Sequence, residues 1–352
     1  MRTGIANLPL HHGRAPRWLF EKMVKLSAAL IEAIVIAKGR KEFLCRISDP
    51  FWFQACGAVL GFDWHSSGVT TTVCGAMKEG IKNISKDLGL YICGGKGATS
   101  RKTPQEIAKQ SERLSIDSEH LIYSSRISAK VDNTCVQDGY NLYHHVFIFT
   151  KEGDWSVIQQ GMNTENRFAR RYHWLSSRLQ SYICEPHTAV CCDDRHPSLN
   201  MVASESETSR TIVTELSREK PDKVIKEAKR ILNMPARHPV LRFDINPRYF
   251  HRVLLKTYER SAEDFQTLIG VNGVGPKTIR ALALIGELLH GATPSFEDPA
   301  RYSFAHGGKD GFPYPVNRDT YNQSITFLKS AINRTKLGNS DKLQALKRLS
   351  SI

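Results

Sequence analysis

The sequence predicts an α+β or α/β amino-terminal domain followed by an all-α carboxy-terminal domain. Three patterns support this prediction. Apolar residues spaced three and four apart between Leu19 and Ile34 indicate a helix, whereas residues 143–150 and 155–160 show the pattern of a β-hairpin. A pair of glycines then separates two further helical patterns within residues 263–290. At 352 residues, the chain is long enough for two or three domains.

The first helix is expected to begin at Pro16 and to end near Gly39. After it, an aromatic and apolar run reaches Phe62 and is followed by a polar cluster that contains Asp63 and His65. In an extended segment these two side chains would share one face, where a carboxylate and an imidazole can bind a metal or act as acid and base. An Asx-type turn with His65 as a hydrogen-bonded neighbour explains the cluster equally well.

A strand at Tyr91–Cys93 is predicted to lead into the glycine-rich segment Gly94–Gly97, which contains Lys96. A flexible glycine turn is the default interpretation, and a backbone contact to nucleic acid is the second. The spacing is not that of a P-loop, so binding of a nucleoside triphosphate is not indicated. A helix is expected over Thr103–Glu112.

The predicted β-hairpin is followed by a segment rich in basic and aromatic side chains, which includes Arg167, Arg170 and Arg171. Such residues can hold phosphates and stack on bases, but the same pattern fits a surface helix that packs its aromatic side chains inward. Asp138, with the acidic residues of the hairpin, raises the possibility of a Mg²⁺-binding nuclease centre. Asp154 beside Gly153 is more typical of a turn.

The most specific pattern lies in Glu263–His290, where Val271–Gly275 is predicted to join two helices by a tight hairpin. Gly273 and Gly275 permit positive φ, and Pro276 suits the first turn of the second helix. Ile279, Leu282, Gly286 and Leu289 mark the expected buried face of that helix. The hairpin amides and the helix N-terminus would converge beside Lys277, a geometry that binds an anion.

Charge supports a polyanionic partner, because 49 Lys and Arg against 35 Asp and Glu give a formal charge of +14. Residues 216–260 hold twelve Lys or Arg and five Asp or Glu. Alone, such a run indicates a solvated helix face; beside a phosphate-binding hairpin, it favours an extended nucleic-acid footprint. The polar stretch Ser204–Ser217 leads out of the first domain. We therefore place an α/β domain that carries any chemistry at residues 1–215 and a helical DNA-binding domain at residues 216–352.

The eight cysteines form no C-x-x-C pair and no regular disulfide pattern. Cys184, His187, Cys191 and Cys192 lie close enough for a metal site, although ordinary core and loop thiols explain the spacing better. The longest apolar run, Leu26–Ala37, is too short to cross a bilayer, and the chain shows no secretory leader pattern. We expect a cytoplasmic protein without a membrane partner.

The whole chain resembles a prokaryotic, largely archaeal family known as domain of unknown function number seven-six-three. Six segments carry the resemblance: GIANLPLHHGRAPRWLF, DPFWFQACGAVLGFDWHSSGVTT, QQGMN, RRYHW, GVGPKTIRAL and FAHGGKDG. The resemblance implies no activity.

Residues 273–278, Gly-Val-Gly-Pro-Lys-Thr, resemble the hairpin of helix-hairpin-helix base-excision DNA glycosylases. That resemblance places Lys277 where the bifunctional members carry their Schiff-base lysine. The sequence departs from the family further on, because Asn317 stands where the catalytic Asp is expected and Asp319 comes two residues later. Lysine is also common in purely structural hairpins, so a non-catalytic clamp is the favoured role of Lys277.

These patterns together predict a DNA-binding protein of repair or nucleic-acid processing, with a nuclease as the first expectation. The expected ligands of a divalent metal such as Mg²⁺ are Asp63, His65 and Asp138. The expected nucleic-acid contacts are Gly273, Val274, Gly275, Lys277, Thr278, Lys96, Arg167, Arg170 and Arg171. The alternatives are a DNA glycosylase/lyase that uses Lys277 and Asp319, and a non-catalytic binding subunit. The partner is expected to be double-stranded or damaged DNA; the patterns leave RNA and the oligomeric state open.

Overall fold

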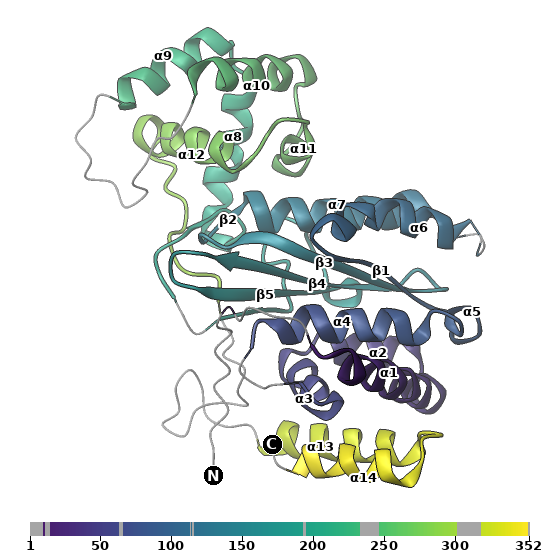
Figure 1. Cartoon of the computed structure of the whole chain (residues 1–352). Helices are drawn as coiled ribbons and strands as arrows, with labels where there is room; N and C mark the ends of the chain where they lie inside the picture. The colour runs from purple at the N-terminus through teal and green to yellow at the C-terminus, as the bar shows by residue number, and fades with distance from the viewer. Residues whose placement is uncertain are drawn as a thin grey trace.

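A five-stranded antiparallel sheet forms the middle layer of the molecule, in the order β1-β3-β4-β5-β6 (Figure 1). The computed structural model describes residues 10, 15–62, 66–112, 114, 116–192, 195–232, 246–300 and 318–350, without the side chains of 230–232, 318–324 and 350. The strands are β1 (Leu90–Lys96), β3 (Asn141–Thr150), β4 (Trp155–Asn163), β5 (Phe168–Leu175) and β6 (Ala189–Cys191). Two short strands, β2 (Val136–Gln137) and β7 (Leu199–Asn200), pair separately. Because every pair is antiparallel, the fold is α+β rather than α/β.

The predicted β-hairpin is confirmed as β3 and β4, which pair from Phe149 and Trp155 at the turn to Asn141 and Met162. Gly153 closes the turn with a φ of 91°, a conformation that glycine adopts without strain. The interpretation of the basic and aromatic segment after the hairpin as a surface helix is wrong, because residues 168–175 form the buried strand β5. Alternating side chains of this strand therefore point to opposite faces of the sheet.

Each face of the sheet is covered by its own hydrophobic core. Phe147, Val157 and Trp174 belong to the core of the upper face, in the orientation of Figure 1, whereas Val146 and Ile158 belong to the core of the lower face. The buried patterns of the central strands are near-continuous because both faces are covered.

The lower face packs on α1 (Arg17–Lys38), α2 (Arg40–Ile47), α3 (Pro50–Leu60) and α4 (Gly68–Ile81), and the short α5 (Ser85–Leu88) follows them. The first helix has the predicted limits, with Pro16 before it and Gly39 after it. Asp49 caps α3 by accepting a hydrogen bond from the Trp52 amide at 2.8 Å, which stabilises the start of this aromatic helix.

The last two helices, α13 (Arg318–Arg334) and α14 (Asn339–Ser350), pack below α1 and α3 (Figure 1). Leu328, Ile332 and Ala345 share the lower core with residues of α1 to α4. The guanidinium of Arg46 lies 4.4 Å from the ring centre of Phe327, which adds a cation–π contact between the first and last parts of the chain.

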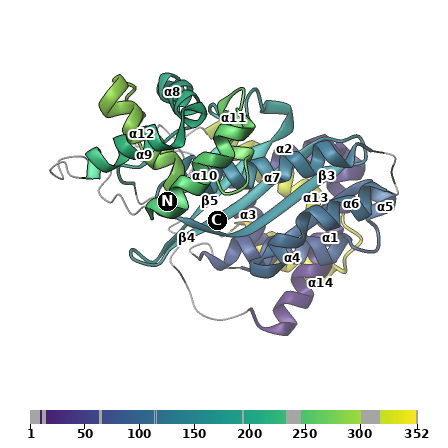
Figure 2. The ribbon, with the colours of Figure 1, turned by 90° about the horizontal axis from the view of Figure 1, so that it is seen from above.

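The upper layer contains η1 (Gly97–Lys102), α6 (Thr103–Ser111) and α7 (Ser118–Thr134). Of these, α6 confirms the helix expected after the glycine-rich segment. Figure 2 shows that α8 (Glu207–Arg218), α9 (Pro221–Leu232), α10 (Pro247–Arg260), α11 (Phe265–Gly270) and α12 (Pro276–His290) gather over one end of the sheet. Short 3₁₀ turns occupy η2 (Ser176–Arg178) and η3 (Ser204–Ser206).

The polar stretch expected to leave the first domain forms η3 and α8, and α8 packs directly on α12. A Cβ at Gly286 of α12 would lie 3.0 Å from Ile212 of α8, so glycine permits the close approach of these helices. The division after residue 215 stays a prediction, and the two cores do not follow it, because α13 and α14 join the amino-terminal helices. None of the helices described is long and apolar enough to cross a membrane.

Candidate nucleic-acid interface and buried polar centre

The predicted pair of helices joined by a hairpin is confirmed as α11, residues 271–275 and α12. Gly273 has a φ of 100°, as the tight turn requires. Gly275 differs from the expectation, because its φ of −140° is ordinary extended backbone. A Cβ at Gly275 would meet no atom within 4 Å, so this glycine leaves open space in front of the hairpin.

The N-terminus of α12 is open towards the hairpin. No side chain caps it, and its first turn holds no acidic residue. The neighbouring helices α10 and α11 are both capped, by the side chains of Asn246 and Asp264 respectively. The backbone amides and the helix dipole at the start of α12 are therefore left to attract an anion.

The predicted contact residues of the hairpin divide by exposure. Lys277 is exposed beside the open N-terminus, whereas Val274 and Thr278 are buried, so only their backbone can face a ligand. Ile279, Leu282 and Gly286 form the expected buried face of α12. Leu289 does not belong to it, because its side chain in the last helical turn is 48% exposed.

The inner side of the hairpin is fixed to the sheet layer. Lys130 of α7 donates a hydrogen bond to the Val274 carbonyl, and Gln137 of β2 donates to the Pro276 carbonyl at 2.9 Å. Arg280 of α12 in turn donates to Gln137 at 2.7 Å. Burial lowers the pKa of Lys130. These contacts hold the hairpin in one orientation relative to the sheet.

A row of polar side chains crosses the lower face of the sheet where His144, Gln160 and Arg171 pair on three adjacent strands. Arg171 is fully buried and donates at 2.9 Å to Thr70 of α4 and at 2.9 Å to Gln54 of α3. Its guanidinium also lies 4.3 Å from the ring centre of Phe53. Burial lowers the pKa of Arg171 to about 10, so it stays charged at neutral pH.

His144 is the unusual member of this row. Neither of its ring nitrogens has a hydrogen-bond partner among the residues that the structure describes, although the side chain is 1% exposed. Burial, with the nearby charges of His145, Arg171 and Lys96, lowers the pKa of His144 to about 3. The imidazole is therefore neutral at physiological pH, with an unprotonated ring nitrogen that can accept a hydrogen bond.

This row lies next to the polar cluster predicted as a catalytic or metal site. Gln160 donates to the Ser67 carbonyl at 2.9 Å, so the chain directly after the cluster touches the row. Asp63 and His65 themselves lie outside the described residues.

The upper face carries a second polar network, centred on Asp132 of α7, which the sequence patterns did not predict. Its carboxylate accepts hydrogen bonds from Gln159 at 2.6 Å and from the Trp174 indole at 3.0 Å, and it pairs with His187 at 2.5 Å. No local sequence signal identifies this network, because Gln159, Trp174 and His187 all lie far from Asp132 along the chain.

Asp138 is engaged by protein groups, at the end of the same face. Its carboxylate accepts from Arg170 at 2.9 Å and from the Tyr172 hydroxyl at 2.6 Å, and Arg170 also donates to Asp298 at 2.8 Å. Burial raises the pKa of Tyr172, so its hydroxyl keeps the proton that it donates. Within the part of the chain that the structure describes, no group of three His, Cys, Asp or Glu side chains could hold a metal ion. Among the described residues, Asp138 therefore does not belong to a set of metal ligands.

The three arginines predicted to hold phosphate lie in different surroundings. Arg170 and Arg171 are both 0% exposed, on opposite faces of the sheet, and only Arg167 is exposed among them. Lys96, at the end of β1, is exposed as well, and its ammonium lies 5.7 Å from the ring centre of Tyr143.

Lys277 and Asp319 are not brought together. Lys277 starts α12 above the sheet, whereas Asp319 belongs to the first turn of α13, in the layer below the sheet (Figure 1). The side chain of Asp319 lies outside the described residues.

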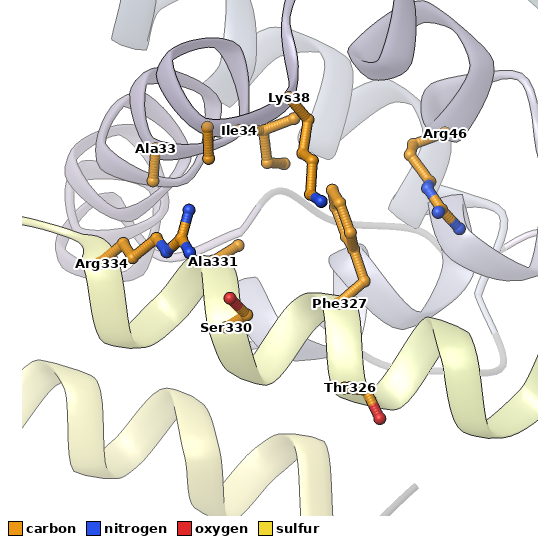
Figure 3. A pocket seen from close by; sticks show the side chains of 10 residues that line it. Ala33, Ile34, Lys38, Arg46, Thr326, Phe327, Ser330, Ala331 and Arg334 are labelled. Atoms are coloured by element: carbon orange, nitrogen blue, oxygen red, sulfur yellow. The ribbon is translucent and has the colours of Figure 1, made fainter.

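A groove of about 620 Å³ separates α1 from α13, away from both the hairpin and the polar row (Figure 3). Apolar side chains such as Ile34 and Ala331 line it, and the cations Lys38, Arg46 and Arg334 stand around it. Arg46 is paired with Glu42 at 2.7 Å. Each of these cations also lies in the last turn of its helix, where it offsets the helix dipole. These contacts account for the charge around the groove without a ligand.

A family model described as protein of unknown function (DUF763) matches residues 4–316, and the chain belongs to this family. No curated protein and no solved structure shows a significant match to the chain. These comparisons give no support to the resemblance to helix-hairpin-helix glycosylases, which rests on the sequence of residues 273–278 alone.

Proposed function

We propose that this member of the DUF763 family is a DNA-binding protein of repair or nucleic-acid processing. In this proposal, α11, the hairpin and α12 grip a phosphate of the duplex backbone. The supporting observation is the open N-terminus of α12, which has no side-chain cap and no acidic residue in its first turn. Lys277 is exposed at the same place, and the space in front of Gly275 admits a phosphate oxygen.

The charge of the neighbouring helices supports the same partner. Arg248, Arg252, Lys256 and Arg260 of α10 are exposed, against the single exposed carboxylate Glu259. Contacts of this kind are to the backbone, so binding should depend little on base sequence. Affinity should also fall log-linearly with salt, with a slope of about −0.9 for each phosphate contacted.

Gly275→Val is the variant that tests the clamp. Gly275 has extended backbone that valine also adopts, and no atom crowds its Cβ position, so the variant should fold. Its side chain would fill the space proposed for the phosphate. We expect the affinity for a labelled DNA duplex, measured by fluorescence anisotropy, to fall by about tenfold or more. Gly273→Val is a poor test, because the φ of 100° strains any side chain there.

Gly338→Val provides the matched control. Gly338 directly precedes α14, has no atom within 4 Å of a Cβ and lies far from the hairpin. It should bind the duplex like the parent chain. Affinity that does not change with salt, or equal affinity of the Gly275→Val and parent chains, would refute the clamp. Tighter binding of duplex RNA than of duplex DNA would reassign the partner.

We further propose that the protein cleaves phosphodiester bonds beside the row of His144, Gln160 and Arg171. The supporting observation is the neutral, buried His144, whose ring nitrogens have no partner among the described side chains. The residues described do not supply a complete set of metal ligands, and Asp138 is already bound by Arg170 and Tyr172. Asp63 and His65, the remaining predicted ligands of Mg²⁺, adjoin this row in sequence through Ser67.

The cleavage proposal is tested with Asp63→Asn, His65→Ala and His144→Ala on a labelled duplex, with Mg²⁺ or with a chelator. Each variant should lose cleavage while duplex affinity stays within about twofold, because the hairpin is on the other face of the sheet. Joint loss of binding and cleavage would make these residues structural and would favour the Asx-turn interpretation of residues 63–65.

A further inference from the structure

One exposed tyrosine stands directly against the hairpin. The hydroxyl of Tyr249, in the first turn of α10, donates a hydrogen bond to the Gly273 carbonyl at 3.3 Å. The Tyr249 side chain is nevertheless 49% exposed, and the Arg252 guanidinium lies 5.9 Å from its ring centre. An aromatic ring with an adjacent cation is therefore presented next to the proposed phosphate site.

The ring belongs to a continuous exposed stripe. Tyr249, Arg252 and Lys256 are spaced three and four residues apart, so they lie on one side of α10. This is the side that borders the hairpin, because a Cβ at Gly273 would lie 3.4 Å from Val253 and 3.9 Å from Tyr249. Among the described residues, neither Arg252 nor Lys256 forms an ion pair. We refer to these three residues as the Tyr249 stripe.

From this arrangement we infer that the Tyr249 stripe stacks on an unpaired base next to the duplex that the hairpin holds. This inference rests on the proposed DNA clamp and narrows its substrate class to duplexes with a single-stranded flank. Aromatic side chains interleaved with cations bind single strands without sequence preference, because each base has a π-face and each phosphate a charge. An acidic peptide would satisfy the two cations but would gain nothing from the ring face.

A purely structural role of Tyr249 makes a different prediction. If the tyrosine only fixes the hairpin, its hydroxyl is the essential group, and Tyr249→Phe should be as harmful as Tyr249→Leu. If the ring stacks on a base, Tyr249→Phe should retain the preference for a flanked duplex, and Tyr249→Leu should lose it. Tyr258 is the matched control: it is 44% exposed on the same helix, nine residues away and therefore about half a turn round.

The experiment compares a blunt DNA duplex with the same duplex carrying a short unpaired flank, on either strand, in anisotropy titrations with the full chain. A 2-aminopurine in the flank reports stacking by its loss of fluorescence. We expect the flank to increase the affinity about fivefold or more, which corresponds to the stacking free energy of one base, and to quench the fluorescence of the 2-aminopurine. Tyr249→Leu should remove both effects, whereas Tyr249→Phe and Tyr258→Leu should keep them.

Equal affinity for blunt and flanked duplexes, with blunt-duplex binding intact, would overturn the stacking inference and leave the clamp standing. Equal losses in Tyr249→Phe and Tyr249→Leu would overturn it as well, in favour of a structural tyrosine. Absence of binding to either duplex would refute the clamp itself. Polyglutamate and single-stranded DNA can also be compared as competitors of the flanked duplex. If polyglutamate displaces the duplex at the same concentration as single-stranded DNA, the stripe recognises charge alone, and stacking is refuted.

Discussion

His144 combines burial with two ring nitrogens that find no partner among the described residues. A buried polar group without a hydrogen bond costs about 1–3 kcal/mol. A leucine at this position would avoid that cost, since Val146 and Ile148 follow on the same face of β3. Stability alone therefore does not explain an imidazole at this position.

The pH dependence of stability should reveal this histidine. Unfolded, the group takes up a proton below pH 6.5, whereas in the folded chain its pKa is about 3. The unfolded state thus binds more protons between these values, and stability falls as pH falls, by about 1.4 kcal/mol per pH unit. Urea unfolding at pH 7, 6 and 5 measures this dependence of the free energy of unfolding on pH. In His144→Leu the loss of stability should be smaller than in the parent chain, by about 0.7 kcal/mol between pH 7 and 6 and by about 1.2 kcal/mol between pH 6 and 5. An equal loss in both chains would contradict the neutral buried imidazole.

Lys277 separates the clamp from the glycosylase. A Schiff-base mechanism needs a neutral amine and a nearby carboxylate, but Lys277 is exposed, and Asp319 lies in the opposite layer. With abasic DNA and borohydride we expect no covalent adduct. Lys277→Gln should weaken duplex binding modestly and reduce the salt slope by about 1. A trapped adduct that disappears in Lys277→Gln would establish the lyase instead.

Local features of the candidate site could be predicted from sequence, but features that depend on strand pairing could not. Gly273 and Pro276 lie in one turn, so their spacing is enough to locate the hairpin. The row of His144, Gln160 and Arg171 depends on the register of three strands. Arg170 and Arg171 were expected at the surface, where arginine usually lies. Because neighbouring side chains of a strand point to opposite faces, the two arginines are buried in different cores, and each donates to acceptors in its own core.

At the scale of elements, the hairpin shows two glycines with different roles. Gly273 supplies a positive φ, whereas Gly275 has ordinary backbone and supplies empty space. The Gly-x-Gly spacing predicts the same role for both glycines, because it does not distinguish a glycine needed for a positive φ from one needed for open space. The predicted helix limits around them were correct, since Pro276 and the apolar spacing are local signals.

The two roles predict opposite behaviour in stability and binding. Gly273→Ala should lower the free energy of unfolding by about 1–3 kcal/mol, because alanine is strained at this φ. Gly275→Ala should leave stability unchanged within about 0.5 kcal/mol, or raise it slightly, and should weaken only duplex binding. Denaturant unfolding and anisotropy on the same samples measure both effects. Equal destabilisation by the two substitutions would contradict the assignment.

At the scale of the molecule, the sheet separates two cores, and the chain ends return to the lower one. The carboxy-terminal helices α13 and α14 cover α1 and α3, although they belong in sequence to the predicted domain that contains the hairpin. Their placement depends on long-range apolar contacts such as those of Leu328 and Ile332, which no local pattern specifies. The mixture of helices and strands was predictable because the hairpin and helix periods are local, but the choice between α+β and α/β depends on strand pairing.

Removal of residues 318–352 should therefore affect the two layers unequally. The lower core loses the apolar partners of α1 and α3, so the thermal midpoint should fall and a dye for exposed apolar surface should bind. Duplex affinity at 20 °C should stay within about twofold, because the hairpin belongs to the upper layer. Lost affinity with an unchanged midpoint would place the last helices in the DNA-binding part.

The contact of Lys130 with the hairpin has a mechanical consequence. Lys130 and Asp132 are neighbours on one rigid helix, yet they project to different sides of it: the first holds the Val274 carbonyl, and the second anchors the sheet through Gln159 and Trp174. A displacement of the hairpin would therefore act on α7 through Lys130, and the buried hydrogen bonds of Asp132 would resist rotation of that helix. The hairpin that would contact a ligand and the buried side chains of the sheet are therefore connected through one helix.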